Sequence, residues 1–391
     1  MIRAPKYPRH GGTRDELNAR VNAYFSDNNL SKTGGWRLLV KALVIASWAC
    51  ASYVALLVWA EPWWLVGLLA ASFGLAHAGI GFSIMHDGGH GASSRRHWAT
   101  RLAAYSLDMI GGSSHLWAFK HNVIHHQYPN IDGVDHDVVV QPWLRLTDTQ
   151  KRRKFHRAQY IYFPLAYTFL SAKWMLHDDF RTLIRRRLGD VPIPPMKRRK
   201  VVEILAFKVF ALGWALALPI ALHGFAWTAA VFVTWAAVSG LALATVFQLA
   251  HSVETTELTS MPAEGERLPR PWAEQQLATT MNFAANNKLL SWYVGGLNFQ
   301  VEHHLFPRIS HIHYPKIAPI VRQVCAERVL PYHSKPSFVA ALLDHAGYLR
   351  AMGREPAVQP AALPSALPRR PQPASAMQFA EAPVQQTRAA L

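Results

Sequence analysis

The sequence predicts an all-α integral membrane protein whose four transmembrane helices form two hairpins beside a cytoplasmic helical cap. Three observations predict this fold class. Four apolar stretches are long enough to cross a bilayer core, which takes about 20 helical residues. Between the second and third stretches, residues 86–200 carry 19 Lys and Arg against 9 Asp. Short clusters of histidines lie next to the ends of the apolar stretches.

The first hairpin is predicted over residues 38–60 and 63–85. Only Glu61 and Pro62 separate these two spans, which indicates a tight turn. Lys41 is close to one end of the first span, so its ammonium group can extend to the interface. The preceding residues 1–35 are polar and basic and contain no signal-peptide core, so we expect a cytoplasmic N-terminal segment.

The second hairpin is predicted over residues 204–222 and 227–250, with a short link at 223–226. Lys208 puts a charge inside the third span. A charge there is costly in lipid, so we expect this side chain to face protein or an interface.

Charge predicts the orientation. Lys and Arg outnumber Asp and Glu by 41 to 24, for a net charge of +17. Positive loops stay on the cytoplasmic side, and the LysArgArgLys run at 197–200 directly precedes the third span. Both termini and residues 86–200 should therefore be cytoplasmic, in a bacterial inner membrane. We find no zinc-finger or RNA-binding motif, so we expect lipid rather than nucleic acid as the anionic partner.

The remaining segments complete the predicted organisation. A membrane domain should cover residues 36–330, with an interfacial or cap helix over 160–170 that is too short to span. Residues 331–354 should add a C-terminal cap segment, and the Pro- and Ala-rich residues 355–391 should be disordered. Of the two cysteines, Cys50 lies in an apolar run, where we expect a buried side chain.

Histidine spacing indicates a metal site. His86 and His90 are four residues apart just after the second span, which places them on one helical face. His121 and His125 repeat this spacing, and the adjacent His126 points about 100° away, toward a possible second metal. A late HisHis pair at 303–304 and a histidine at 251, after the fourth span, complete the set.

Eight imidazoles exceed the needs of one tetrahedral ion and suit two metals with open positions. Zinc has no redox chemistry, so it would not activate O₂. Imidazole ligation with open positions favours iron, although ligand type alone also admits copper or manganese.

The motifs HDGGH, HNVIHH and QVEHH, in this order around two hairpins, resemble the three histidine boxes of the membrane fatty acid desaturase family. The run GGLNFQVEHHLFP at 295–307 is similar to the third box of front-end desaturases, in which Gln replaces the first histidine. The resemblance extends over residues 36–330.

This resemblance implies a di-iron centre. The implied iron ligands are His86, His90, His121, His125, His126, His251, His303 and His304, with Gln300 in the slot of a ligand histidine. The carboxylates that could orient these imidazoles are Asp87, Asp132, Asp135 and Glu302. The histidines that match no ligand position and are expected to be structural are His97, His115, His136, His156, His177, His311 and His313. No separate acid or base is assigned.

The implied reaction is O₂-dependent formation of a C=C bond in a fatty-acyl chain carried by CoA, acyl carrier protein or a lipid. Many front-end desaturases carry a fused cytochrome b5 domain. Residues 1–35 are too few for one, and the sequence contains no HisProGlyGly haem motif. The resemblance therefore implies a separate electron donor of the ferredoxin or cytochrome b5 type.

Three other functions remain open from the residues. A related hydroxylase, ketolase or acetylenase would differ in its product. A metal transporter would place ligands at mid-membrane depth, where only His77 lies. A haem-binding cytochrome would need fewer, less clustered histidines.

Overall fold

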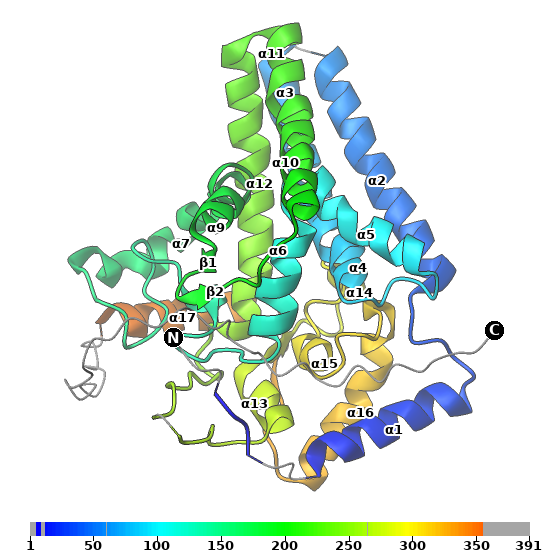
Figure 1. Cartoon of the computed structure of the whole chain (residues 1–391), viewed down its shortest axis with the longest axis vertical. Coiled ribbons are helices and arrows are strands. Elements are labelled where there is room, and N and C mark those ends of the chain that lie inside the picture. The colour runs from blue at the N-terminus through cyan, green and yellow to red at the C-terminus, as the bar shows by residue number, and fades with distance from the viewer. Residues whose placement is uncertain (1–4, 9–11, 60, 264, 355–391) are drawn as a thin grey trace.

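The computed structural model describes residues 5–8, 12–59, 61–263 and 265–354, and these are mostly helical. The expected disordered tail, residues 355–391, lies outside this range. Four helical runs are long and apolar enough to cross a membrane, and they extend toward one end of the molecule (Figure 1). The shorter helices gather at the other end. The sequence prediction of a helical membrane protein with four such helices is confirmed at this level.

The four runs comprise α2 (Gly35–Val58), α3 (Trp63–Gly79) continuing to α4 (His86–Gly89), α10 (Arg198–Leu212) continuing to α11 (Leu218–His223), and α12 (Phe225–His251). The other helices are α1 (Thr13–Asp27), α5 (His97–Met109), α6 (Ser114–Ala118), α7 (Gln159–Thr168), α8 (Leu170–Lys173), α9 (Asp179–Arg185), α13 (Trp272–Thr279), α14 (Lys288–Tyr293), α15 (Gln300–Leu305), α16 (Tyr314–Glu327) and α17 (Phe338–Arg354). The strands are β1 (Arg187–Leu188) antiparallel to β2 (Val191–Pro192), and β3 (Met281–Phe283) parallel to β4 (His333–Lys335).

Helices α3 and α12 form the inner pair of the long helices. About half of the most apolar stretch of each is buried, 56% and 50%, against 28% in α2 and 22% in α10–α11. Close packing of the inner pair requires Gly74, because a Cβ there would lie 2.7 Å from the Trp235 carbonyl oxygen. The outer helices expose Val54 and Val209 to their surroundings. Such apolar outer faces suit contact with lipid.

The charged and sulfur-bearing side chains of the long helices test three expectations. Lys208 is buried and forms an ion pair with Asp179 at 2.7 Å, as expected for a charge that faces protein. The prediction that Lys41 reaches the interface is wrong: Lys41 is buried, with its Nζ 2.8 Å from His311 Nε2. Cys50 is exposed, not buried, because it lies on the largely exposed outer face of α2.

Two π-helical segments adjoin the histidine clusters. One covers Ile80–Met85 and ends directly before His86, and the other covers Phe119–His125. In the second, the His126 amide donates to the His121 carbonyl oxygen at 2.9 Å, five residues back. The wider turn brings side chains five residues apart onto one face, an arrangement that sequence spacing alone does not reveal.

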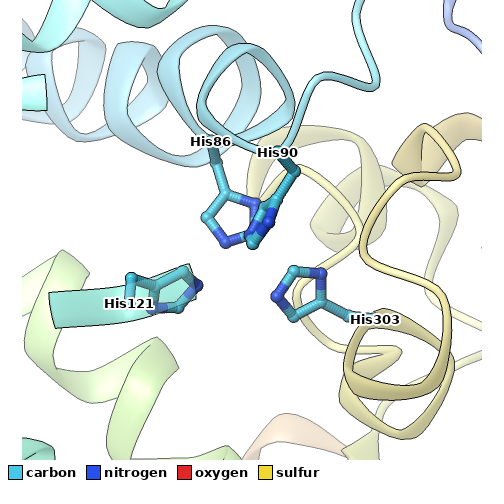
Figure 2. A group of neighbouring side chains, drawn as sticks. All are labelled: His86, His90, His121 and His303. Carbon is cyan, nitrogen blue, oxygen red and sulfur yellow. The ribbon is translucent and has the colours of Figure 1, made fainter. Parts of the chain in front are cut away.

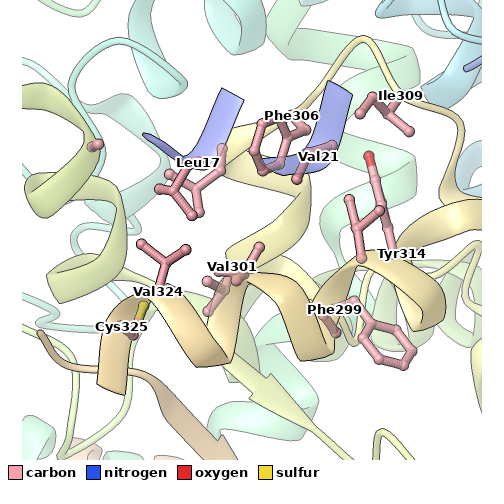
Figure 3. Packing of buried hydrophobic residues seen from close by; sticks show 14 of the residues in the cluster. Leu17, Val21, Phe299, Val301, Phe306, Ile309, Tyr314, Val324 and Cys325 are labelled. Atoms are coloured by element: carbon pink, nitrogen blue, oxygen red, sulfur yellow. The ribbon is translucent and has the colours of Figure 1, made fainter. Parts of the chain in front are cut away.

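A hydrophobic core joins α15 to α1 and α16 (Figure 3). Leu17 and Val21 on α1 pack with residues of α15 and α16, including Val301 and Val324. The N-terminal segment, expected only to be polar, thus contains an amphipathic helix with apolar residues four apart. Its packing fixes the helix that carries the third histidine motif.

Gly295 offers a test of how this region docks on the π-helical segment Ile80–Met85. Its φ is +61°, and an added Cβ would lie 2.1 Å from the Phe82 carbonyl oxygen. We expect Gly295→Ala to destabilise the protein by about 1–3 kcal/mol, because the conformation is strained for a side chain and the backbone is in the way. Thermal unfolding in detergent measures this change.

Gly67→Ala is the matched control, since Gly67 is helical and nothing lies within 4 Å of its added Cβ. This control should keep or raise the unfolding temperature. Equal stability of the two variants would contradict the proposed close approach.

Candidate metal centre

Histidines from three separate parts of the chain converge at the end of the long helices (Figure 2). His86 and His90 come from α4 and the residue that follows it, His121 from the second π-helical segment, and His303 from α15. All four are buried, and each offers a ring nitrogen within 4.8 Å of the others. This spacing is compatible with binding a single ion between them.

A second group adjoins the first. His125, His251 and His304 also bring ring nitrogens within 4.8 Å of one another. His126 lies between the groups, since its nitrogen meets those of His303 and His304 within the same limit. The ring centroids of His126 and His304 are 4.4 Å apart, and those of His126 and His303 are 4.6 Å apart. The eight histidines predicted from the sequence therefore form one continuous buried cluster with two parts.

The second histidine motif divides between the two parts. His86 and His90 share one group, as their spacing predicts, but His121 joins them while His125 joins the other group. His121 and His125 also share a third set, with Asp137. His121 Nε2 lies 3.2 Å from His126 Nε2, which follows from the five-residue repeat of the π-helical segment.

Hydrogen bonds to Nδ1 orient three of these rings. His303 Nδ1 lies 3.1 Å from the Tyr314 hydroxyl, His304 Nδ1 lies 2.9 Å from Gln276 Oε1, and His125 Nδ1 lies 3.0 Å from Asp135 Oδ2. A hydrogen bond at one ring nitrogen determines which nitrogen is left to bind a metal. These partners therefore present Nε2 to the centre.

Several Nε2 atoms at the centre are buried without a partner. Among the residues that the structure describes, His86, His90, His303 and His304 have no hydrogen bond at Nε2. Leaving a buried polar atom unsatisfied costs about 1–3 kcal/mol. Four such atoms pointing to one region fit a site whose bonds are completed by metal ions.

Gln300 and His251 lie side by side at the second group. Gln300 Nε2 is 2.9 Å from His251 Nε2, and His251 Nδ1 is 3.1 Å from the Thr279 carbonyl oxygen. The Gln300 Oε1 atom is buried and has no partner within the described residues. An amide oxygen here is positioned to hold a metal or a water molecule, in the slot that the sequence comparison with histidine boxes assigned to Gln300.

Burial favours the neutral form of these imidazoles. It lowers the pKa of His90, His126 and His303 well below the usual value, and charge on neighbouring imidazoles lowers it further. The same two causes lower the pKa of His121 and His304. A neutral imidazole is the form that binds a metal, so the cluster is prepared for ligation at neutral pH.

His125 differs from the other histidines. Burial lowers its pKa, but Asp135 and Asp137 outweigh burial and raise it. Asp137 was not identified from the sequence. It lies 3.5 Å from His125 Nδ1 and 2.5 Å from Lys120 Nζ. Its position two residues after Asp135 is the only signal that could have suggested it.

The other predicted orienting carboxylates contact different partners. Asp132 accepts from the Thr149 hydroxyl, and Glu302 accepts from Asn282 Nδ2 at 2.8 Å. Asp87 lies 3.0 Å from His311 Nδ1. Its neighbour in sequence is His86, but its side chain points toward the loop before α16. Of the four, only Asp135 has a described hydrogen bond to one of the eight clustered histidines.

The histidines expected to be structural lie outside the two groups. His156 is buried and 2.9 Å from the Pro142 carbonyl oxygen, and His177 is exposed beside Asp178. His77 packs against the rings of Trp235 and Phe73 inside the long helices.

These features define a class of protein: a helical membrane protein with a buried, two-part histidine centre at one end of its long helices. The profile of the family described as "Fatty acid desaturase" matches residues 62–336. The chain belongs to the fatty acid desaturase family, and it is an oxidoreductase that desaturates a fatty-acyl chain with iron-dependent chemistry.

Curated relatives agree with this membership. The chain is 36% identical over 352 residues to an "sn-1 linoleoyl-lipid 6-desaturase" of Arthrospira platensis, covering 88% of this chain and 94% of that protein. A protein of the same name from Synechocystis sp. is 35% identical, covering 89% and 98%. An "Acyl-lipid (8-3)-desaturase" of Physcomitrium patens is 32% identical, covering 85% and 70%.

Asp135 tests the role of hydrogen bonds around the centre. We expect Asp135→Asn to weaken metal retention about 10- to 100-fold, because it replaces the carboxylate that fixes the His125 ring. Iron content after dialysis against graded chelator concentrations measures the effect. Asp132→Asn is the control, since Asp132 contacts Thr149 and not a histidine. Similar metal loss from both variants would contradict a specific role for Asp135.

Proposed function

We propose that this chain forms a C=C bond in an acyl chain of a membrane lipid, at two irons bound by the two histidine groups. His86, His90, His121 and His303 would hold one iron, and His125, His126, His251 and His304 the other. Gln300 would hold a water molecule or complete the second group. The observation that carries this proposal is the presence of two adjoining groups of buried ring nitrogens.

The chemistry that iron supplies when bound is O₂-dependent oxidation of methylene groups that offer no acidic proton. The chain's own residues prepare the place where it happens. Burial of both histidine groups excludes bulk water. Tyr314, Gln276 and Asp135 hold three imidazoles in one orientation, so the ligand nitrogens need not reorganise during the reaction.

The names of the relatives support a lipid-linked substrate. The relatives from Arthrospira platensis and Synechocystis sp. are named as acting on a linoleoyl lipid, and this chain matches 94% and 98% of their lengths. The Physcomitrium patens relative is also named as an acyl-lipid enzyme. A lipid-borne acyl chain can reach the centre from the bilayer, because the centre lies at the end of α3 and α12.

We also propose a topology and an electron donor. Two hairpins, α2–α3 and α10–α12, would place both termini and the histidine centre in the cytoplasm. The cationic start of α10, with Arg198, Arg199 and Lys200, supports this orientation. Electrons would come from a separate soluble protein of the ferredoxin or cytochrome b5 type.

His304→Ala tests the centre. We expect desaturation to fall by at least about 100-fold, since a ligand is lost, and bound iron to fall toward one per chain. The measurements are lipid analysis of an expressing host, with double-bond positions mapped, and the iron content of the purified protein. The mapped positions also show which carbon is attacked.

His177→Ala is the matched control because His177 is exposed and lies outside both groups. It should keep full activity and iron. Full activity in His304→Ala would contradict the ligand assignment. An alcohol or alkyne as the main product would replace desaturation with the hydroxylase or acetylenase alternative.

A further inference from the structure

A groove of about 870 Å³ opens between the start of α2, helix α14 and helix α16. Its lining combines cationic side chains with an apolar and aromatic surface. The cationic residues are Arg37, Lys41, Lys288 and Arg322. Trp292 and Phe299 contribute aromatic surface, and no carboxylate is among the described lining residues. The groove is therefore suited to a molecule with an anionic end and an apolar body.

The positive charge of the groove is mostly unpaired. Within the described residues, no carboxylate lies within ion-pair distance of Arg37, Lys288 or Arg322, and all three are exposed. Of the acidic groups that contact lining residues, Asp87 and Glu302 are buried behind His311 and Tyr332. Glu327 accepts from Gln323 at 2.8 Å and is paired with Arg20 on α1. Unpaired guanidinium and ammonium groups beside an aromatic wall are a common arrangement for binding phosphate.

Two residues that line the groove connect it with the histidine motifs. Phe299, which lines it, directly precedes Gln300 in the chain, and its carbonyl oxygen accepts from the His303 amide at 3.0 Å. His311, which also lines the groove, contacts Asp87, the residue after His86. The groove lining is therefore linked by direct contacts to the segments that carry the first and third histidine motifs.

The outer end of the groove lies where lipid headgroups should be. Trp36 at the start of α2 is 71% exposed, and Leu289 and Trp292 on α14 are 78% and 40% exposed. Exposed Trp and Leu side chains next to basic residues, at the end of a membrane-length helix, are typical of the membrane interface. The opening therefore faces the headgroup layer, where a lipid can enter sideways.

We propose that this groove binds the phosphate of an anionic glycerophospholipid and thereby selects phospholipid-linked acyl chains for desaturation. This inference rests on the proposed function. Arg322 and Lys288 bind the phosphate, Trp292 packs against the glycerol region, and the acyl chain extends past Phe299 toward the histidines. The buried Lys41 supports the groove from inside, since its Nζ contacts His311 and lies 5.3 Å from the Trp292 ring centroid.

A competition experiment in one vesicle tests this selection. The iron-loaded protein is reconstituted with a reducing system and equal amounts of phosphatidylglycerol and phosphatidylcholine, which carry the same acyl chains with different isotope labels. The wild type should favour phosphatidylglycerol severalfold. Arg322→Gln and Lys288→Gln should each reduce the product ratio about fivefold or bring it close to one. A ratio near one in the wild type would overturn the proposal.

Lys316→Gln is the matched control, because Lys316 is an exposed cation on α16 that does not line the groove. It should leave the ratio unchanged, and an equal effect of Lys316→Gln and Arg322→Gln would count against a specific phosphate site. A third arm supplies the same acyl group as its CoA thioester. Faster use of the thioester, lost in Arg322→Gln, would assign the groove to a nucleotide phosphate and overturn the lipid assignment.

A binding measurement separates failure of the site from failure of the proposed function. Native mass spectrometry of the purified protein should retain phosphatidylglycerol over phosphatidylcholine in the wild type, and Arg322→Gln should lose this preference. Retention without desaturation of any lipid would reject the proposed function and keep the site. Desaturation without any headgroup preference in binding would reject the site and keep the function.

Discussion

The burial of eight imidazoles in one small volume is the constraint on which the rest of the structure depends. Ring nitrogens within 4.8 Å of one another cannot all be protonated in a medium of low polarity. Among the described residues, five ring nitrogens of these histidines have no hydrogen-bond partner. Without bonds to these atoms the cluster is costly, which makes metal ions part of the energetics of folding as well as of catalysis. The surrounding elements hold the rings in a geometry that favours this ligation.

The elements that meet at the centre come from distant parts of the chain, so its geometry depends on tertiary packing. The end of α12 supplies His251, the π-helical segment Phe119–His125 supplies His125, and α15 supplies His304. The core of α1, α15 and α16 holds the third motif rigidly, while Gly295 lets its loop approach the π-helical segment Ile80–Met85. A change in any of these contacts alters the distance between histidine groups, although it touches no ligand.

The sequence predicted the long helices and the histidine cluster because both follow from local patterns. A run of apolar residues long enough to cross a bilayer has to be helical in lipid. Histidines four residues apart lie on one helical face, a spacing that indicates metal ligands. The details that depend on side-chain direction were not predictable. Asp87 and Asp135 both lie close in sequence to histidines of the cluster, yet only Asp135 forms a described hydrogen bond to one of them. In the π-helical segment, His121 and His125 stay close to each other, with ring centroids 5.2 Å apart, but they belong to different histidine groups, which their spacing does not reveal.

Lys41 was expected to extend to the membrane interface, but it is buried in the protein. A lysine near a helix end in lipid extends to water unless protein provides a partner. Here Lys41 contacts His311, and His311 in turn contacts Asp87. These three residues connect the start of α2, the first histidine motif and the loop before α16 through one buried chain of polar contacts. A buried charge is stable only when its partners are fixed, so this chain of contacts ties the groove wall to the metal centre. The same packing that removes Lys41 from the interface therefore joins the place where a lipid would enter to the place where it would react.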